Sequence, residues 1–545
     1  MIKCITTPIF YASGEPHVGH AYSAFIADAI SRFHQLQGCQ TFLVTGTDEN
    51  GQKIERSAYS SGSGAGTSTD SEIKKFVDKN AMSFRELWKG LDINFDQFVR
   101  TTGKDHHVLV ESIWNKLISN DDIYLGTYEG LYCTDCEQFY SEWQLSSGSC
   151  PIHNNAVERI SEPSYLFRLN KYREKLLDYY RLNPEKITPT FYQQELIHYL
   201  EQSEIEDLSI SRVNVNWGIQ VPNDTKHTVY VWLDALFSYV TAIQNAGLSP
   251  QALKDTTHVI GKDILQFHGI YWPAFLFAAD LPFPEKIVVH GWWTLDGYKI
   301  SKSNPASLVK PLQLSNAITN DGLRYGLLRQ KPLSRDGNFK MSEFVLAINS
   351  DLSNNLGNLV KRFSSLVNKF FRGEIILEKD TSADSDGQKL IDETDGAIAV
   401  ITEAYLNYNF QLVCTVANHL VSSTNRYIHN REPWKLDKGR TEKNVAETLC
   451  VVNAVLKVVF VLYNPIIPEV CRKIQSQLTC DDTEIRWPQE CVLSNVTVKP
   501  ASSVFARLSV DTVSVDKLSE DRLSSNDLLN DKLAKDRTDK SLLTR

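Results

Sequence analysis

An alternating strand and helix pattern starts at the N-terminus, breaks off near residue 123 and resumes near residue 224. The first part reads as a strand (IKCITTPIFY), a turn (ASGEP) and an apolar-periodic helix, and a second strand follows at TFLVTGTDENG. The pattern returns in HTVYVWLDALFSYV, HVIGKDILQFH and KIVVHGWW. Such units predict a Rossmann-type, doubly wound α/β domain, which binds ligands at the carboxyl ends of its strands. We therefore expect its halves at residues 1–123 and 224–297, split by an insertion at 124–223.

The remaining chain divides by composition. Residues 298–340 contain a Ser- and Lys-rich loop and a linking region, and residues 341–500 show nearly continuous helical periodicity, which predicts a helix bundle. The drifting Asp/Lys repeat within residues 501–545 predicts a disordered tail, and the Ser/Gly-rich residues 57–69 predict a flexible loop.

Composition excludes several classes of protein. A chain of 545 residues is long enough for several domains with sizeable cores. Its net charge of −9 argues against indiscriminate nucleic-acid binding, which depends on Lys and Arg, although a local RNA-binding patch stays compatible. Ten cysteines are too sparse for a disulfide scaffold. No membrane association is expected, because the longest apolar run, 451–463, contains Asn453 and Lys457 and is typical of a buried helix.

The segment HVGH places His17 and His20 three residues apart, where the first strand gives way to a helix. Such a pair can bind a metal, sit in a packed turn, or contact a phosphate. No third ligand is close in the sequence, as in H-E-x-x-H, whereas the turn before a helix is a place where imidazoles, Gly19 and backbone N–H groups can converge on an anion. The position therefore favours a phosphate over a metal.

A second basic element, YKISKS, follows the predicted strand KIVVHGWW. Lys299 and Lys302 flank Ser301, and a solvated basic turn is the ordinary interpretation of such a pair. Lysine is also a good point charge for a polyphosphate group.

The predicted insertion contains two metal-binding knuckles. Cys133 and Cys136 form C-x2-C, and Cys150 and His153 form C-x2-H after thirteen intervening residues. This spacing predicts a tetrahedral Cys3His zinc site with a structural role, because protein fills all four positions. The alternative is that the cysteines are simply buried thiols.

In the predicted bundle, Asn358 and Arg362 lie four residues apart on one helix face, and Trp434 follows a proline at a helix start or in a loop. Such side chains can read base edges and stack an unpaired base of RNA, or form an ordinary polar helix face with a structural Trp.

Taken together, HVGH and KISKS resemble the HIGH and KMSKS signatures of class I aminoacyl-tRNA synthetases, with Ile300 in place of methionine. TTPIFYASGEPHVGHAY, TGTDENG, VYVWLDALFSY and IGKDILQFH resemble blocks of the methionyl-tRNA synthetases, in the same order, over about residues 1–500. Asn50 stands where that family usually has histidine. The resemblance implies that Asp48 holds the α-amino group of methionine and that the pocket is lined by Ile9, Tyr11, Trp232, Ala235, Leu236, Tyr239, Ile264 and His268. Aromatic rings among these suit the polarizable sulfur of methionine.

The resemblance further implies the reaction and its partners. The expected function is an ATP-dependent methionine–tRNA ligase of bacterial or organellar type, with ATP contacting His17, Gly19, His20, Lys299, Ser301 and Lys302. The partners are L-methionine, ATP with Mg²⁺, and tRNA(Met), whose CAU anticodon meets Asn358, Arg362 and Trp434; one structural Zn²⁺ is expected. The alternatives are another class I synthetase or a non-catalytic tRNA-binding protein with the same fold.

The Ser/Gly segment and the tail suggest a eukaryotic gene, so we expect the mitochondrial matrix, with bacterial cytoplasm as the alternative. The sequence shows no transit peptide before its first strand. A monomer is expected, because the sequence has no appended dimerisation module.

Overall fold

The structure is a computed structural model that describes residues 2–61, 69–140, 142, 145–152, 155–202, 205–295, 298–300, 310–377, 382–435, 441–478, 485–500 and 503–509. It divides into two compact units. The first contains residues 1–309, 331–337 and 405–409, and the second contains residues 310–330, 338–404 and 410–545.

The first unit is built on a six-stranded sheet with the strand order β3-β2-β1-β12-β13-β7. All of its neighbouring strands run parallel. The order reverses between β1 and β12, which is the point where a doubly wound sheet opens a crevice for ligands. The strands are β1 (Ile2–Tyr11), β2 (Gln40–Asp48), β3 (Gln97–Arg100), β7 (Ile187–Thr188), β12 (Thr256–Gly261) and β13 (Lys286–His290).

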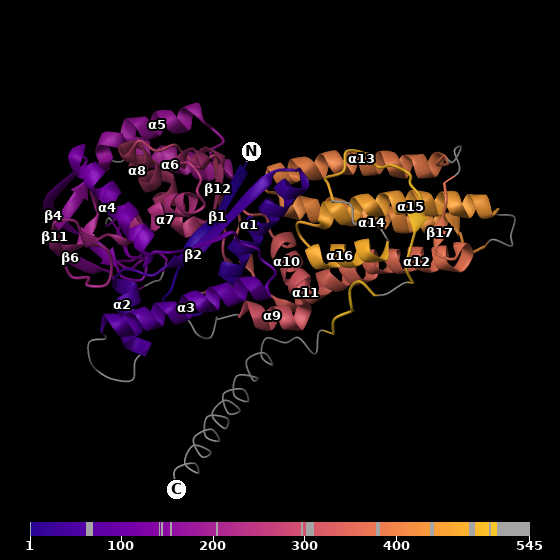
Figure 1. Ribbon diagram of the computed structural model, residues 1–545, viewed down its shortest axis with the longest axis horizontal. Helices are drawn as coiled ribbons and strands as arrows, with labels where there is room; N and C mark the ends of the chain where they lie inside the picture. Colours follow the sequence, from indigo (N-terminus) through magenta and orange to yellow (C-terminus); the bar gives the residue numbers. More distant parts are fainter. Residues whose placement is uncertain are drawn as a thin grey trace, which may run out of the picture. The chain divides into compact units, whose positions relative to one another are not determined.

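Helices cover both faces of this sheet. α1 (Val18–Leu36) packs against β1, β2 and β12, while α7 (Val231–Asn245) packs against β1, β2 and β3. Figure 1 shows these two helices on opposite sides of the strands. Both are buried over most of their surface, which is why their sequences are apolar on nearly every face. The other helices of the sheet domain are α2 (Gln52–Ser61), α3 (Asp70–Gly90), α4 (Lys104–Ser119) and α8 (Trp272–Ala279).

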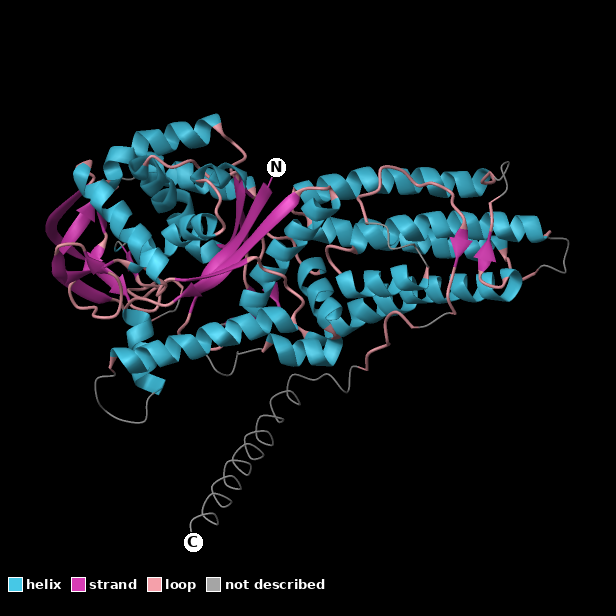
Figure 2. Ribbon diagram, in the orientation of Figure 1, coloured by secondary structure: helices cyan, strands magenta, loops and turns pink. Residues whose placement is uncertain are grey.

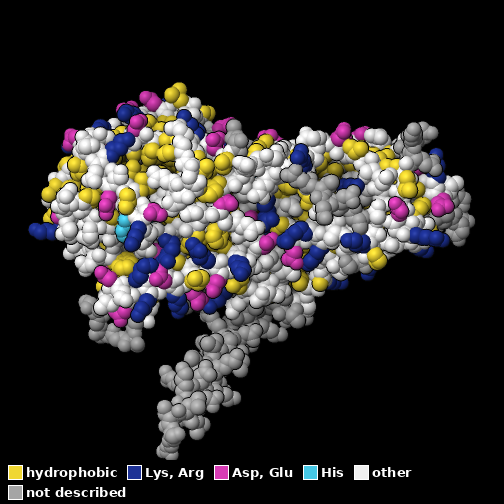
Figure 3. All heavy atoms as spheres, viewed as in Figure 1, with side chains coloured by type: hydrophobic (Ala, Val, Ile, Leu, Met, Phe, Trp, Pro, Cys, Tyr) yellow, Lys and Arg dark blue, Asp and Glu magenta, His cyan; other side chains and the backbone are white. Residues whose placement is uncertain are grey.

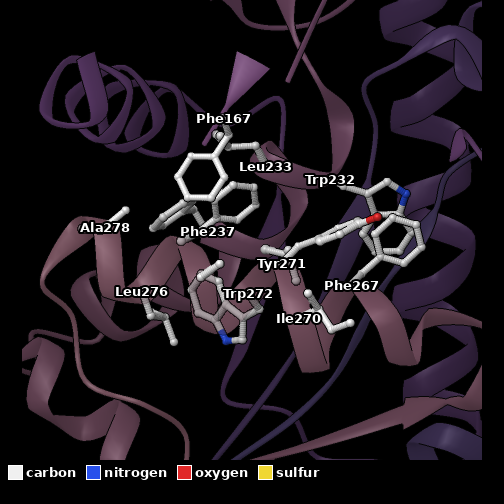
Figure 4. Close-up of a cluster of buried hydrophobic side chains, with 14 of the residues drawn as sticks. Phe167, Trp232, Leu233, Phe237, Phe267, Ile270, Tyr271, Trp272, Leu276 and Ala278 are labelled. Atoms are coloured by element: carbon white, nitrogen blue, oxygen red, sulfur yellow. The ribbon is translucent and has the colours of Figure 1, made fainter. Parts of the chain in front are cut away.

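An aromatic core joins α7 and α8 to the strand end of the insertion. Phe237 packs edge-on against Trp272, and Phe167 packs edge-on against Phe275, with ring centroids 5.2 and 4.9 Å apart. Trp272 is fully buried, so its truncation to alanine should cost about 3–5 kcal/mol. Trp232 and Phe267 lie together at one edge of this cluster (Figure 4), where the core becomes the wall of a cavity.

The insertion is largely antiparallel sheet. One sheet has the order β5-β4-β6-β8 and another the order β10-β11-β9. The expected insertion, residues 124–223, is not wholly separate from the main sheet, because β7 lies within that range and pairs with β13. The elements here are β4 (Ile123–Cys133), β5 (Gln138–Tyr140), β6 (Glu158–Phe167), α5 (Arg173–Leu182), α6 (Thr190–Gln202), β8 (Leu208–Ser209), β9 (Ser211–Arg212), β10 (Gln220–Val221) and β11 (Asp224–Val229).

The second unit is the predicted helical part, and Figure 2 shows it as helices running alongside one another with one short strand pair. One segment differs from the expected regular helix, because Ile348–Gly357 is a π-helix that leads directly into α12. The elements are α9 (Pro311–Ile318), α10 (Asn320–Arg329), α11 (Met341–Ala347), α12 (Asn358–Phe371), β17 (Glu374–Ile375), α13 (Ser385–Leu406), α14 (Phe410–Arg431), α15 (Glu442–Tyr463), α16 (Pro468–Gln477) and β18 (Val496–Thr497).

The most apolar helix is α15, which is long and hydrophobic enough by composition to cross a membrane. In the fold, 83% of that apolar window is buried inside the protein, where it packs against α12, α14 and α16. It is therefore a core helix of the bundle, as its Asn453 and Lys457 predicted.

On the face shown in Figure 3, acidic and basic side chains are interspersed, in keeping with a net charge of −9.

Candidate functional site

A cavity of about 260 Å³ lies at the carboxyl ends of β1 and β12, at the reversal point of the sheet. All the residues expected to hold methionine line this one cavity, and so do Ile300 and three residues of the HVGH turn. They are Ile9, Tyr11, His17, Gly19, His20, Asp48, Trp232, Ala235, Leu236, Tyr239, Ile264, His268 and Ile300. The cavity has a largely apolar end beside α7 and a more polar end beside the start of α1.

The two histidines of HVGH cap the N-terminus of α1 through a reciprocal pair of hydrogen bonds. His17 is the N-cap, and its Nδ1 accepts a hydrogen bond from the Gly19 N–H at 3.1 Å. The Nδ1 of His20 accepts one in return from the His17 N–H at 2.9 Å. A ring nitrogen that accepts carries no proton, so each neutral imidazole has its N–H at Nε2. The start of a helix thus gains two ring donors beside its own N–H groups, which together suit an anion.

Gly19 makes this arrangement possible because it has no side chain. This role is separate from its expected contact with ATP. A Cβ at position 19 would lie 2.9 Å from His17 Cε1 and 3.0 Å from His17 Nδ1. The glycine therefore leaves the space in which the His17 ring folds over the first turn of the helix.

Asp48 ends β2 and is 3% exposed. Its Oδ1 is buried with no hydrogen-bond partner among the described residues. Burial raises the pKa of Asp48 well above its usual value, and the charges of Asp234 and Glu137 raise it further. A buried carboxylate with an unused oxygen fits a ligand that brings a positive charge and N–H donors.

The apolar end of the cavity is walled by aromatic rings. Trp232 stacks on Phe267 with ring centroids 3.6 Å apart, and Tyr11 meets Trp232 edge-on. His268 Nδ1 donates to the Ile264 carbonyl at 3.0 Å, so its Nε2 accepts from the Tyr239 hydroxyl at 2.8 Å. Burial lowers the pKa of His268 to about 4, which keeps the ring neutral. A neutral, aromatic wall of this kind suits an apolar, polarizable side chain.

Asn50, which departs from the family pattern, is a buried structural donor. It is 4% exposed, and its Nδ2 donates to Asp234 Oδ2 at 2.7 Å. The other oxygen of Asp234 contacts His106 Nε2 at 2.6 Å. Asparagine is thus accommodated at this position by an acceptor on α7.

The polar end of the cavity contains residues that sequence reasoning missed, among them Ser23, His290 and Trp293. His290 Nε2 and Ser23 Oγ are 2.8 Å apart, which ties the end of β13 to α1. Beneath them, Lys331 Nζ donates to the Tyr22 hydroxyl at 3.0 Å, and burial lowers the pKa of this lysine to about 7. The sequence could have indicated His290, because this residue lies at the carboxyl end of a predicted strand.

The KISKS element is only partly described. Ile300 is 2% exposed and lines the cavity, so the apolar exchange at this position keeps a buried side chain. Lys299 belongs to β15 (Tyr298–Lys299), of which only the backbone is described, and Ser301 and Lys302 lie outside the described residues. The roles of these three residues stay predictions.

Three of the four predicted zinc ligands meet in the insertion. The sulfur atoms of Cys133, Cys136 and Cys150 all lie within 4.8 Å of one another, with 3.5 Å between those of Cys136 and Cys150. Tetrahedral zinc with Zn–S bonds of about 2.3 Å needs sulfurs roughly 3.8 Å apart, so this cluster fits the metal. The Ile152 N–H also points at Cys150 Sγ, at 3.4 Å. His153 lies outside the described residues.

One member of the cysteine cluster, Cys136, forms part of the cavity wall, which the sequence did not indicate. Asp135, Cys136, Gln138 and Ile152 all line the cavity. Lys53 connects the two regions, because its Nζ donates to the Asp135 carbonyl at 2.6 Å and lies 4.6 Å from the centre of the Tyr11 ring.

In the second unit, two of the three predicted anticodon residues are in contact. The Arg362 guanidinium lies 5.7 Å from the centre of the Trp434 ring, and its Nη1 is 3.5 Å from Asn425 Oδ1. Trp434 follows the end of α14 and is 37% exposed. Asn358 is exposed at the start of α12, one turn before Arg362. Arg362 and Trp434 thus form an aromatic and polar surface of a kind suited to an unpaired base, and Asn358 lies four residues before Arg362 on the same helix.

Comparison with known proteins gives two family matches. The model described as tRNA synthetases class I (M) matches residues 3–160 and 145–364, and that of the anticodon binding domain of methionyl tRNA ligase matches residues 378–526. Among curated relatives, the methionine–tRNA ligase of Caldanaerobacter subterraneus subsp. tengcongensis is 37% identical over 515 residues, covering 93% of this chain and 79% of the relative. The Rickettsia felis ligase is 39% identical over 491 residues, covering 88% and 92%.

Among solved structures, the Mycobacterium tuberculosis methionyl-tRNA synthetase in complex with methionyl-adenylate superposes with a TM-score of 0.86. It is 32% identical in sequence, and the match covers 93% of this chain and 100% of that chain. The family matches span both units, and the relatives above 30% identity and this superposition point to the same family. The chain belongs to the methionyl family of class I tRNA synthetases.

Proposed function

We propose that this chain is a methionine–tRNA ligase, which activates methionine with ATP to methionyl-adenylate and transfers it to tRNA(Met). One observation carries the proposal beyond family membership. The residues expected for methionine and the histidine turn expected for ATP, which are far apart in the sequence, line a single cavity at the reversal point of the sheet.

In the activation step, a methionine carboxylate oxygen attacks the α-phosphorus of ATP, and the bond to pyrophosphate breaks. Asp48 binds the α-amino group, and Trp232 and Tyr239 enclose the side chain. The Nε2–H donors of His17 and His20 stabilise the charge that grows on the phosphoryl oxygens, and Lys299 and Lys302 neutralise the polyphosphate. No protein nucleophile is required, since these residues act by positioning and charge stabilisation. Mg²⁺ arriving with ATP would supply further charge neutralisation for the pyrophosphate.

In the transfer step, the 2′ hydroxyl of the terminal tRNA adenosine attacks the activated carbonyl carbon, and AMP leaves. Recognition of the tRNA is assigned to the second unit. Trp434 stacks a base of the CAU anticodon, and Arg362 and Asn358 hydrogen-bond to base edges.

The cysteine cluster is proposed to hold one Zn²⁺ through Cys133, Cys136, Cys150 and His153. With four protein ligands the metal has no open position for water, so its contribution is to fold the knuckle. The donor set of three close sulfurs supports this assignment.

A methionine-dependent ATP–pyrophosphate exchange assay tests the proposal. Exchange should require methionine and should not occur with leucine, isoleucine or cysteine. Charging of a tRNA(Met) transcript, compared with one whose CAU anticodon is changed, then tests the second step. Absence of exchange with methionine, or charging that ignores the anticodon, would contradict the proposed function.

Two further expectations are carried as proposals, a mitochondrial location and a monomeric state. The first rests on the Ser/Gly segment and the tail, and the curated relatives given above are bacterial. Fractionation of cells that express the complete gene product tests the location, and light scattering coupled to gel filtration tests the oligomeric state.

A further inference from the structure

We infer that Glu137 is a positioning residue for the methionine site, because it connects two walls of the cavity from the turn between β4 and β5. The inference rests on the proposed function and assigns a role to a residue outside the signature motifs. Glu137 is 1% exposed and follows Cys136, the member of the cysteine cluster that lines the cavity. Its side chain reaches one wall, and its backbone carbonyl reaches the other.

The Glu137 side chain caps α2, the helix that follows Asp48. Gly51 directly precedes this helix, and its carbonyl accepts the first helical hydrogen bond, from the Glu55 N–H. A glycine cannot supply the side-chain oxygen that often caps a helix from this position. Glu137 supplies the oxygen instead, since its Oε1 accepts a hydrogen bond from the Lys53 N–H at 3.0 Å.

The glycine leaves the space that the glutamate fills. A Cβ at position 51 would lie 2.9 Å from Glu137 Oε2 and closer still to Oε1, so a side chain there would push the carboxyl group away from the helix. The cap does not depend on charge, because a carboxyl group accepts at Oε1 whether or not its other oxygen carries a proton. Oε2 has no hydrogen-bond partner among the described residues. The site therefore requires at position 137 an acceptor with the reach of a glutamate.

The cap fixes a residue of the first cavity wall. Lys53 lines the cavity, and its ammonium group lies 4.6 Å from the centre of the Tyr11 ring. The turn of the insertion holds Lys53 at both ends, since Glu137 binds its backbone N–H and the Asp135 carbonyl accepts from its Nζ at 2.6 Å. Tyr11 in turn meets Trp232 edge-on, with ring centroids 6.4 Å apart. Displacement of the first turn of α2 therefore moves Lys53 away from the ring that it covers.

The second wall is the start of α7. The Tyr230 hydroxyl donates to the Glu137 carbonyl, and Tyr230 is the N-cap of α7. Trp232, which stacks on Phe267 at the methionine end of the cavity, follows two residues later. Glu137 thus joins the helix start beside Tyr11 to the helix start that carries Trp232, and these two rings pack against each other where the methionine side chain is expected.

Two conservative variants separate reach from charge. Glu137→Gln keeps the length and an acceptor oxygen without the charge, whereas Glu137→Asp keeps the charge but is one methylene shorter. In pyrophosphate exchange, E137Q should have a KM for methionine within about twofold of wild type, because an amide oxygen accepts as a carboxyl oxygen does. E137D should raise that KM by about fivefold, the equivalent of one lost helix cap. Its kcat at saturating methionine should stay within about twofold of wild type, since the turn with His17 and His20 is untouched.

Two measurements and one control exclude a general structural effect. The zinc content of both variants should equal that of wild type, as expected for an intact cysteine cluster. Hydrogen exchange, followed by mass spectrometry on peptides that cover the first turn of α2, should be faster in E137D and unchanged in E137Q. Glu72→Asp is the matched control: Glu72 accepts from the Thr69 N–H at 2.7 Å at the start of α3, away from the cavity lining, so this variant should keep the wild-type KM for methionine.

Several results would overturn the role of Glu137 while leaving the proposed function intact. They are a wild-type KM in E137D, a KM in E137Q raised as far as that of E137D, a similar rise in E72D, or a loss of zinc from E137D. If E137D does not fold, Gly51→Ala serves in its place, because its Cβ displaces the carboxyl group; it should also raise the KM, and a wild-type KM would overturn the role. Wild-type protein with no methionine-dependent exchange would overturn the proposed function itself.

Discussion

Replacing Gly19 by alanine should reduce catalysis while barely changing stability. The new Cβ would lie 2.9 Å from His17 Cε1, so the imidazole must rotate away. The hydrogen bond from the Gly19 N–H to His17 Nδ1 is then lost, which costs about 1 kcal/mol of N-cap stabilisation. Alanine in place of glycine in a helix returns up to about 1 kcal/mol. The two effects nearly cancel, and the free energy of unfolding should change by less than about 1 kcal/mol.

Activity should respond very differently. Rotation of the His17 ring moves its Nε2–H donor, and displacing one positioned donor typically costs about 100-fold in turnover. Pyrophosphate exchange at saturating methionine and ATP should fall by about that factor, while methionine binding, followed by tryptophan fluorescence, should be unchanged because Asp48 and the aromatic wall are untouched.

A second glycine provides a matched control. Gly396 lies within α13, and an added Cβ there meets nothing within 4 Å. Gly396→Ala should therefore raise stability by about 1 kcal/mol with no loss of exchange. Wild-type exchange in folded G19A would refute the role of the His17 ring, and an exchange loss accompanied by more than about 2 kcal/mol of destabilisation would show that the effect is structural.

Three further experiments test separate parts of the site. Trp434→Ala should leave pyrophosphate exchange intact and lower kcat/KM for tRNA charging by about 10- to 100-fold, because one stacked base is worth about 1–3 kcal/mol. Lys302→Ala should instead lower the turnover of pyrophosphate exchange. Equal effects of the two variants on exchange would contradict the division of roles. Metal analysis of protein purified without chelator should give one zinc per chain, and Cys150→Ser should abolish it; a trace amount in wild type would exclude the zinc site. Between pH 7 and pH 5, the free energy of unfolding of wild type should fall by about 2 kcal/mol more than that of His268→Gln. The reason is that this histidine is protonated below its ordinary pKa of 6.5 in the unfolded chain, whereas in the folded protein its pKa is about 4. Urea titrations that give parallel pH curves for the two proteins would contradict this prediction.

The sequence was informative where chemistry lies at the end of a periodic element. HVGH follows an apolar strand and opens a helix, and TGTDENG ends the next strand, so parallel packing alone brings His17 and Asp48 to the same edge of the sheet. The C-x2-C and C-x2-H pairs were readable for a similar reason, because a zinc site imposes short, fixed spacings.

Other features depend on contacts that no local pattern encodes. Cys136 and Ile152 form part of the cavity wall only because the insertion folds back onto α2, through contacts such as that of Lys53 with the Asp135 carbonyl. The π-helix at Ile348–Gly357 was likewise not predictable, since its sequence has ordinary helical periodicity.

Position 50 shows how a departure from a family pattern can be understood once its neighbours are known. In the sequence, asparagine in place of histidine weakens any role assigned to that position. In the structure, Asn50 Nδ2 gives Asp234 a hydrogen-bond donor but no charge, and His106, from a helix more than fifty residues further along the chain, contacts the other oxygen. A buried carboxylate needs a hydrogen-bond partner at each of its oxygens, and here two residues from different elements provide them. Asn50 and His106 are therefore linked through Asp234, a connection between distant positions that neither motif nor periodicity can show.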